Sequence, residues 1–301
     1  MSLKEEFKFK DRLIKGIESG GQFKISVVKT TDVIRTAQKN HNLSLLSTLL
    51  LGRTLTAAML LASELKGEER IKIRLEGSGP VGSITAEANR VGEMRGYVQN
   101  PRAELDYSDP KVTIGDGIGI GLLTVSKILY DEAEPRTSTI QIVEGDILSD
   151  MAHFMAQSEQ VLSAFLLDVD INEDGVVEQA GGVLIQRLPD ADETVMDQLQ
   201  KTVSEMPQVS SMLKEGLYID EIMVRASRPF SIKELDRQPV HFFCRCSPER
   251  FMNALSMLNY DDLKELKDDK QEIVCHYCGN RLTVSKGEME KLFEAAKAKL
   301  N

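Results

Sequence analysis

Cysteine is scarce in this chain of 301 residues: there are four, and none occurs before position 244. A chain with so few thiols, grouped at one end, does not have the composition of a disulfide-built secreted domain. The four thiols are better suited to holding a metal ion or to redox chemistry. Their placement makes the last fifth of the chain the first candidate for a functional site.

Positive charge is also in short supply. The chain has 37 Lys and Arg against 47 Asp and Glu, which gives a formal net charge of −10 and a pI near 5.1. Binding to a phosphate backbone relies on Lys and Arg, and an anionic membrane surface repels an acidic protein. We therefore expect neither nucleic acid nor membrane as a partner.

Two further features are missing: an apolar secretion signal and an uninterrupted membrane span. The chain starts MSLKEEFKFKDRLIKG, which is charged throughout, so we expect a cytoplasmic protein. Residues 43–65 are strongly apolar, but they include Arg53 and Glu64. A buried core helix is the favoured interpretation of that segment.

Alternating and helical patterns divide the rest of the chain. QFKISVVKT (22–30) and IKIRLEG (71–77) alternate as strands do. Residues 164–171 and 176–188 predict two strands joined by an NEDG turn, and Ser149 with Asp150 suggests the N-terminal cap of a helix. Internal repeats and low-complexity tracts are not found.

These patterns predict an α+β fold in three parts. We expect a large mixed α/β N-terminal domain over 1–190, a helical linker over 191–236 and a small C-terminal zinc-binding domain over 237–301. The linker has apolar residues at helical spacing, interrupted by Pro207: Met196, Leu199, Val203, Met206 and, beyond the proline, Met212. The simplest role for this apolar face is to pack the linker onto the N-terminal domain.

The cysteines form two pairs, Cys244 with Cys246 and Cys275 with Cys278. Two pairs of soft ligands brought together by the fold are typical of a tetrahedral zinc site. CHYCGN resembles a zinc knuckle, a tight turn that carries two thiolates. His276 lies inside the knuckle, but four thiolates already complete the shell, so we expect His276 to be exposed.

Zinc at this site predicts folding that depends on redox state. A zinc-bound thiolate stays deprotonated and open to oxidants, and a disulfide within C-x-C closes a strained ring that is easily reduced again. Structural zinc contributes ~10–16 kcal/mol in small zinc peptides, whereas a whole domain is stable by only ~5–15 kcal/mol. Oxidation of even one pair would therefore release the metal and unfold the small unit.

Other motifs in the sequence do not support a further ligand or catalytic site. DINEDG (170–175) begins like a calcium loop but has Gly181 where the bidentate acid belongs, and GDGIGIG lacks phosphate-loop spacing. His41 and His153 have no visible nucleophile partner, so no catalytic residue is assigned. Two alternatives remain open: a thiol–disulfide oxidoreductase using Cys275 and Cys278, and a binding adaptor with a static zinc module.

The chain as a whole resembles the bacterial redox-regulated chaperone family, the thirty-three-kilodalton heat-shock proteins. LGRTLTAAMLLASELKG, EGSGPVGSITAEAN, MRGYVQNP and AGGVLIQRLP are similar to the family's N-terminal domain, and FFCRCSPERF and VCHYCGN to its zinc domain. All four cysteine positions match. The resemblance implies a stress-response holdase that works without ATP and is not an enzyme.

The resemblance also implies how such a protein is switched. In the reduced state one Zn²⁺ per chain is bound by Cys244, Cys246, Cys275 and Cys278, and the chaperone is inactive. Oxidative stress forms the disulfides Cys244–Cys246 and Cys275–Cys278, the zinc domain and linker lose structure, and a homodimer binds unfolding client proteins. Clients later pass to ATP-driven foldases. The methionine-rich linker face is a candidate client-binding surface because methionine adapts to varied partners.

Overall fold

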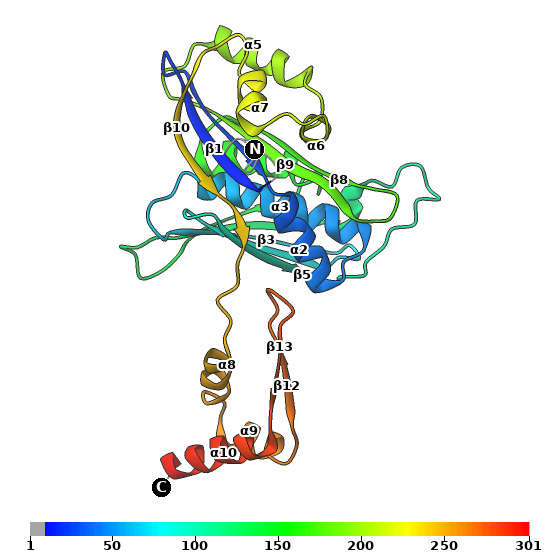
Figure 1. The fold of residues 1–301 in the computed structure, drawn as a ribbon, viewed down its shortest axis with the longest axis vertical. Coiled ribbons are helices and arrows are strands. Elements are labelled where there is room, and N and C mark those ends of the chain that lie inside the picture. The colour runs from blue at the N-terminus through cyan, green and yellow to red at the C-terminus, as the bar shows by residue number, and fades with distance from the viewer. Residues whose placement is uncertain (1–9, 301) are drawn as a thin grey trace, which may run out of the picture. The chain divides into compact units, whose positions relative to one another are not determined.

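The computed structural model describes residues 10–300, so most of the charged start of the chain lies outside it. The chain divides into two compact units, Met1–Phe243 and Cys244–Asn301. Both contain helices and strands (Figure 1), which confirms the α+β class. Residues 191–243 belong to the first unit, and the three-part division at residues 190 and 236 remains a prediction.

Two sheets form the frame of the first unit. The five-stranded antiparallel sheet has the order β10-β1-β2-β9-β8, with bounds Ile232–Pro239, Arg12–Glu18, Phe23–Lys29, Val177–Arg187 and Ser163–Ile171. The six-stranded sheet has the order β11-β5-β4-β3-β6-β7, with bounds His241–Phe242, Glu93–Val98, Ser83–Asn89, Arg70–Gly77, Gly121–Ile128 and Arg136–Gln141. Only the short β11 runs parallel to its neighbour.

Helix α3 (Leu45–Ala62) packs against strands of both sheets and forms the centre of the core. Its apolar length would suffice for a membrane span, yet 83% of it is buried inside the protein. Arg53 donates a hydrogen bond to the Asp146 carbonyl at 3.2 Å, which satisfies part of the hydrogen-bonding capacity of its guanidinium. The expected core helix is therefore present. The preceding α2 (Thr31–His41) and the short η1 (Ile114–Gly117) complete this layer.

The opposite face of the five-stranded sheet is covered by three helices, α5 (Glu193–Ser204), α6 (Val209–Lys214) and α7 (Ile219–Ala226) (Figure 1). Their apolar side chains pack with Ile14, Phe23 and Ile25 into a second core. Of the predicted linker face, Leu199 and Met212 are buried in this core, while Met196, Val203 and Met206 are partly buried and pack against it.

Strand β10 follows these helices and was not anticipated. Its sequence, IKELDRQP, is mostly polar, because an edge strand has one partner and little buried surface. It pairs with β1 along its length, with a bulge at Lys15 and Gly16. The linker therefore ends as a sheet strand, where the sequence had indicated only helix.

The expected cap at Ser149 and Asp150 is wrong. Helix α4 (Leu148–Phe154) begins after Ile147, and Asp146 accepts the free backbone N–H of Ser149 at 2.8 Å. Asp150 is fully buried and accepts the backbone N–H groups of Val143 and Glu144, at 2.7 and 3.1 Å. Its carboxylate thus holds the loop that precedes α4 instead of capping the helix, a role that the cap pattern in the sequence does not reveal.

The NEDG segment forms the predicted hairpin turn between β8 and β9. Asn172 and Val176 exchange two hydrogen bonds, from the Asn172 backbone N–H to the Val176 carbonyl and from the Val176 N–H to the Asn172 side chain, both at 2.9 Å. Gly175 has a φ of +77°, which favours glycine. Turn geometry accounts fully for this motif.

The second unit is small. Strands β12 (Gln271–Val274) and β13 (Arg281–Val284) form a hairpin, accompanied by α8 (Pro248–Leu255), α9 (Tyr260–Leu266) and α10 (Lys286–Leu300). Its fully buried apolar core consists of four residues, Leu263, Val284, Met289 and Phe293. Ser285 and Glu288 form a capping box at the start of α10. So small a core calls for further cross-linking.

A buried carboxylate supports the chain just before the second unit begins. The Asp11 side chain accepts the Val33 backbone N–H at 2.8 Å and lies 3.5 Å from the Lys29 ammonium, while the Asp11 carbonyl accepts the Val240 N–H at 3.1 Å. Burial raises the pKa of Asp11 to about 7, and the nearby Lys29 charge opposes this only in part. Asp11 therefore titrates near neutrality.

This raised pKa predicts a pH-dependent stability that Asp11→Asn removes. Between pH 3.8 and 7, Asp11 is protonated in the folded protein but ionised in the unfolded chain. Its contribution to the free energy of unfolding is therefore full below about pH 4 and falls as the pH rises to 7. Between these values the wild type should lose up to about 4 kcal/mol of unfolding free energy relative to Asp11→Asn. Urea unfolding of both proteins across this pH range measures the difference. Free energies of unfolding that change with pH in parallel for the two proteins would contradict the prediction.

Candidate metal centre

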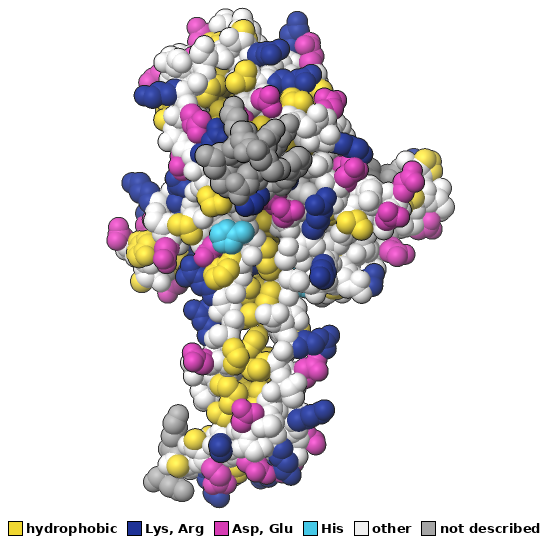
Figure 2. Space-filling model, viewed as in Figure 1, with side chains coloured by type: hydrophobic (Ala, Val, Ile, Leu, Met, Phe, Trp, Pro, Cys, Tyr) yellow, Lys and Arg dark blue, Asp and Glu magenta, His cyan; other side chains and the backbone are white. Residues whose placement is uncertain are grey.

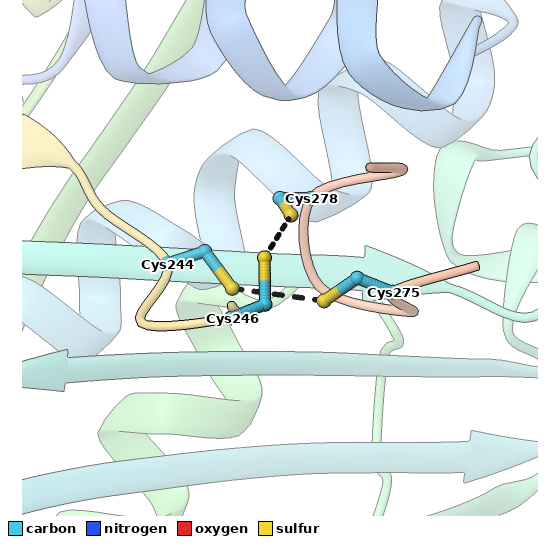
Figure 3. A group of neighbouring side chains, drawn as sticks. All are labelled: Cys244, Cys246, Cys275 and Cys278. Atoms are coloured by element: carbon cyan, nitrogen blue, oxygen red, sulfur yellow. Dashed lines mark hydrogen bonds between the residues drawn. The ribbon is translucent and has the colours of Figure 1, made fainter. Parts of the chain in front are cut away.

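The sulfur atoms of the four cysteines lie close together in the second unit. All four lie within 4.8 Å of one another. The Cys246 and Cys278 sulfurs are 3.3 Å apart and the Cys244 and Cys275 sulfurs 3.7 Å apart, so the nearest contacts join one pair to the other (Figure 3). In the part of the chain that the structure describes, no other group of three or more His, Cys, Asp or Glu side chains is close enough to hold a metal ion.

The turn between β12 and β13 positions the second pair. The Cys275 N–H donates to the Asn280 carbonyl at 2.9 Å, and the Gly279 N–H donates to the Cys275 carbonyl at 2.8 Å. Gly279 adopts a φ of +70°, a conformation that side chains strongly disfavour. These bonds make the tight turn expected of a knuckle and direct both thiols to one side of it.

The first pair lies on irregular chain. Only His241 and Phe242 are in a strand, so Cys244 and Cys246 are not placed on one face by strand periodicity. Local bonds hold them instead: Ser247 caps α8 by accepting the Arg250 N–H at 3.3 Å, and the Arg250 guanidinium donates to the Arg245 carbonyl at 2.8 Å. Pro248 occupies the first turn of α8, where its missing N–H leaves no hydrogen bond unmade.

Asn280 also supports the cluster, although no motif in the sequence singled it out. Its side-chain amide donates to the Cys246 sulfur at 3.6 Å, and its backbone N–H donates to the Cys278 sulfur. One residue thus supports a sulfur of each pair. The signal available in the sequence was the asparagine directly after the knuckle glycine, a residue type suited to hydrogen bonding at turns. His276, by contrast, is exposed and outside the cluster.

The electrostatics of the cluster call for a cation. Burial raises the pKa of the Cys278 thiol, and the neighbouring thiols raise it further, while the hydrogen bond from Asn280 lowers it. Four such groups cannot all ionise side by side unless a positive charge lies among them. Four soft sulfur donors in a compact group suit a tetrahedral ion such as Zn²⁺. The residues present therefore fit a metal ion well.

The visible surface gives no sign of a large basic region. On the face shown in Figure 2, Lys and Arg side chains are interspersed with Asp and Glu. This distribution agrees with the acidic composition of the chain.

Fold and site together define a class: an α+β protein whose small second unit carries a compact four-cysteine metal centre. The family model described as Hsp33 protein matches residues 11–285, and the chain belongs to the Hsp33 family. Similar curated proteins include a 33 kDa chaperonin of Desulforamulus reducens, 35% identical over 96% of this chain and 99% of that protein. Another, of Thermus thermophilus, is 37% identical over 93% of this chain and 86% of that protein.

A solved structure agrees with this assignment. The crystal structure of the 33 kDa chaperonin (heat shock protein 33 homologue) of Thermotoga maritima superposes with a TM-score of 0.89 at 29% identity, covering 96% of this chain and 99% of that one. The family resemblance inferred from sequence motifs is confirmed. The relatives are named as chaperonins rather than enzymes, which agrees with the expected chaperone role and absence of enzymatic activity.

The knuckle glycine offers a test of the centre. Gly279→Ala places a side chain at φ +70°, at a cost of about 1 kcal/mol, and should weaken metal binding roughly fivefold. Competition with a chromophoric chelator, using Zn²⁺ as the probe, measures the affinity. Gly287→Ala is the matched control, because a Cβ there meets nothing within 4 Å. Equal affinities for the two variants would contradict the role of the turn.

Proposed function

We propose that this chain is a redox-regulated holdase that acts without ATP in the cytoplasm and prevents aggregation of unfolding proteins during oxidative stress. The observation that carries the proposal is the convergence of all four thiols of the chain on one centre, in a unit with a small core. Membership of the Hsp33 family supports the chaperone role and the binding of client proteins.

The reduced state is the inactive one in this proposal. One Zn²⁺ per chain, bound by Cys244, Cys246, Cys275 and Cys278, would hold the four sulfurs as thiolates and contribute most of the stability of the small unit. The linker helices then stay packed on the five-stranded sheet. Their apolar face is unavailable to clients because it forms part of the second core.

Oxidation converts the four thiols into two disulfides, which we assign as Cys244–Cys246 and Cys275–Cys278. Each disulfide forms as two thiolates lose two electrons to one molecule of peroxide, which takes up two protons from solvent and is reduced to two molecules of water, and the Zn²⁺ that loses its ligands is released. The nearest sulfur contacts in the structure join Cys246 to Cys278 and Cys244 to Cys275. The assignment within each pair is therefore supported by the family resemblance and by the short loops that it closes, and not by proximity.

Loss of the four metal ligands removes the main support of the small unit. We propose that its unfolding spreads to the linker and exposes the face formed by Met196, Leu199, Val203, Met206 and Met212. Methionines give this face soft, adaptable contacts, which suit unrelated clients. The oxidised chain would act as a homodimer and later transfer clients to ATP-driven foldases.

Client aggregation measured by light scattering tests the switch. The reduced, zinc-loaded protein should be inactive, and peroxide treatment at mild heat should produce suppression in step with zinc release. Because the chain has only four cysteines, peptide mapping of the oxidised protein assigns both disulfides without ambiguity. Equal activity in the two states would make the centre structural, and disulfides joining one pair to the other would overturn the assigned pairing.

The linker face has its own test, a pair of methionine substitutions. Met212 is fully buried, so Met212→Ala should destabilise linker packing by ~2–5 kcal/mol and give the reduced protein partial holdase activity. Met257 is 86% exposed, and Met257→Ala should change stability by less than about 0.5 kcal/mol. Limited proteolysis of residues 191–236 provides the readout. A linker equally resistant before and after oxidation would contradict its proposed release.

A further inference from the structure

Asn280 bonds to three of the four cysteines. Its backbone carbonyl accepts the Cys275 N–H at 2.9 Å, and its backbone N–H donates to the Cys278 sulfur. Its side-chain amide donates to the Cys246 sulfur at 3.6 Å, across 34 residues of sequence. The Cys246 and Cys278 sulfurs are themselves 3.3 Å apart (Figure 3). One asparagine therefore bonds to both sulfurs of a contact that joins the two pairs.

These three bonds differ in what they require of the residue. The two backbone bonds belong to the knuckle turn, in which Gly279 has a φ of +70°, and any residue with a backbone N–H can make them. The bond to Cys246 needs a short side chain with a donor group, which the asparagine amide supplies and an alanine or aspartate lacks. It is therefore the bond that a substitution removes alone.

The side-chain bond falls on the more accessible of the two sulfurs. Cys278 is buried, at 6% exposure, whereas Cys246 is only partly buried. An oxidant must reach a sulfur from solvent, so Cys246 is the more open of these two to attack. The backbone bond thus goes to a sulfur that packing already protects, and the amide of Asn280 bonds one that packing leaves open.

The charge of a loaded centre gives this amide a stabilising role. Four thiolates around one Zn²⁺ leave the centre with a net negative charge, and hydrogen bonds from N–H groups to a charged acceptor are stronger than those to a neutral one. Removal of a group that bonds a metal ligand typically lowers the metal affinity by roughly 10–100-fold. We expect the Asn280 amide, which meets one sulfur, to act at the lower end of that range.

The same bond lowers the reactivity of the sulfur. A thiolate attacks peroxide with an electron pair, and an N–H group bonded to that sulfur withdraws part of the same electron density. The nucleophilicity of a thiolate changes less steeply than its basicity, with a slope of about 0.4–0.5. A bond that changes the basicity of the sulfur tenfold therefore changes the rate of attack roughly threefold.

We propose that Asn280 is a positioning residue that keeps Cys246 in the metal centre and slows its attack on peroxide, and that it thereby sets the oxidant dose at which the metal is released. This role rests on the proposed redox function. The overall reaction is unchanged: two thiolates lose two electrons to one molecule of peroxide, which takes up two protons and becomes two molecules of water, and the Zn²⁺ is released. Asn280 changes only how fast that reaction begins at Cys246.

Two substitutions of Asn280 test this role. Asn280→Ala removes the amide, and Asn280→Asp keeps its shape but replaces the donor with a negatively charged acceptor. Asn280 is exposed, so neither change empties a core position. Asn253→Ala is the matched control, because Asn253 is exposed on α8 of the same unit and lies outside the cluster.

Zinc affinity and zinc release are measured on the full chain. In competition with a chromophoric chelator, Asn280→Ala should bind Zn²⁺ about tenfold more weakly than the wild type, and Asn280→Asp more weakly still. With every centre loaded, peroxide should release zinc from Asn280→Ala about threefold faster. Asn253→Ala should match the wild type in both measurements. A release rate for Asn280→Ala equal to that of the wild type would overturn the proposal.

Cobalt provides a direct measurement of the sulfur. Co²⁺ bound by thiolates has an absorption band in which electron density moves from sulfur to metal, and loss of an N–H bond to sulfur makes that transfer easier. The band of Asn280→Ala should therefore move to longer wavelength, while the ligand-field bands keep their tetrahedral pattern. A band at the wild-type wavelength, together with weaker binding, would mean that Asn280 acts only through the shape of the turn and would overturn the proposal.

Failure of the proposed redox function gives a different result. A wild-type chain that binds no zinc, or that keeps it in peroxide, would overturn both the redox function and the role of Asn280. A wild-type chain that releases zinc on oxidation, with Asn280→Ala releasing it at the same rate, would overturn the role of Asn280 alone. Circular dichroism of the loaded variants checks that the differences arise in folded proteins.

Discussion

The convergence of four sulfurs within 4.8 Å is the constraint on which the second unit depends. That unit has four fully buried apolar residues, whereas the first unit has a core that runs through both sheets and α3. An apolar core of four residues offers little net stability, and a metal-bound group of thiolates can exceed it severalfold. The cluster also brings residues 244–246 next to residues 275–278, so the segment between them, with α8, α9 and β12, forms a loop closed by the four sulfurs. If the centre binds a metal as proposed, the stability of the small unit is concentrated in thiolates that an oxidant can convert to disulfides, while the first unit depends mainly on apolar packing.

The five-stranded sheet links the stability of the small unit to the exposure of apolar surface in the proposed switch. One face of the sheet packs on α3, and the other packs on the linker helices through Phe23, Ile25 and Ile14. If the linker leaves, two apolar surfaces become exposed together: the linker's own face and the face of the sheet that it covered. A holdase needs apolar surface that is hidden until it is required. In the proposed function, the linker would meet this need by packing as an ordinary core element while the protein is reduced.

Local patterns in the sequence predicted those elements that form without specific contacts to distant parts of the chain. The apolar density of α3, the NEDG turn, the capping box at Ser285 and the two cysteine pairs are all visible in short windows. Strand β10 was missed because its residues are polar and only the distant β1 gives it strand geometry. Asp150 was misassigned because its hydrogen-bond partners belong to the preceding loop rather than to its own helix.

The residues before Cys244 determine how far a loss of order can travel. Residues 240–243 follow β10 and are attached to the rest of the first unit by a few bonds. The His241 N–H donates to the Gly92 carbonyl at 3.0 Å, and the Phe243 N–H donates to the Met94 carbonyl at 2.9 Å. The end of β10 itself is held by its pairing with β1 and by bonds from Arg90 to the side chains of Asp236 and Gln238. The pairing of β11 with β5 is parallel and two residues long, which is weak by sheet standards. The stronger hold comes from Val240, buried at 4% exposure and bonded to Asp11. In the proposed switch, unfolding that enters from Cys244 would meet this buried point before it reaches β10 and the linker helices. The Asp11 region would then be the place where local disorder either stops or becomes release of the linker.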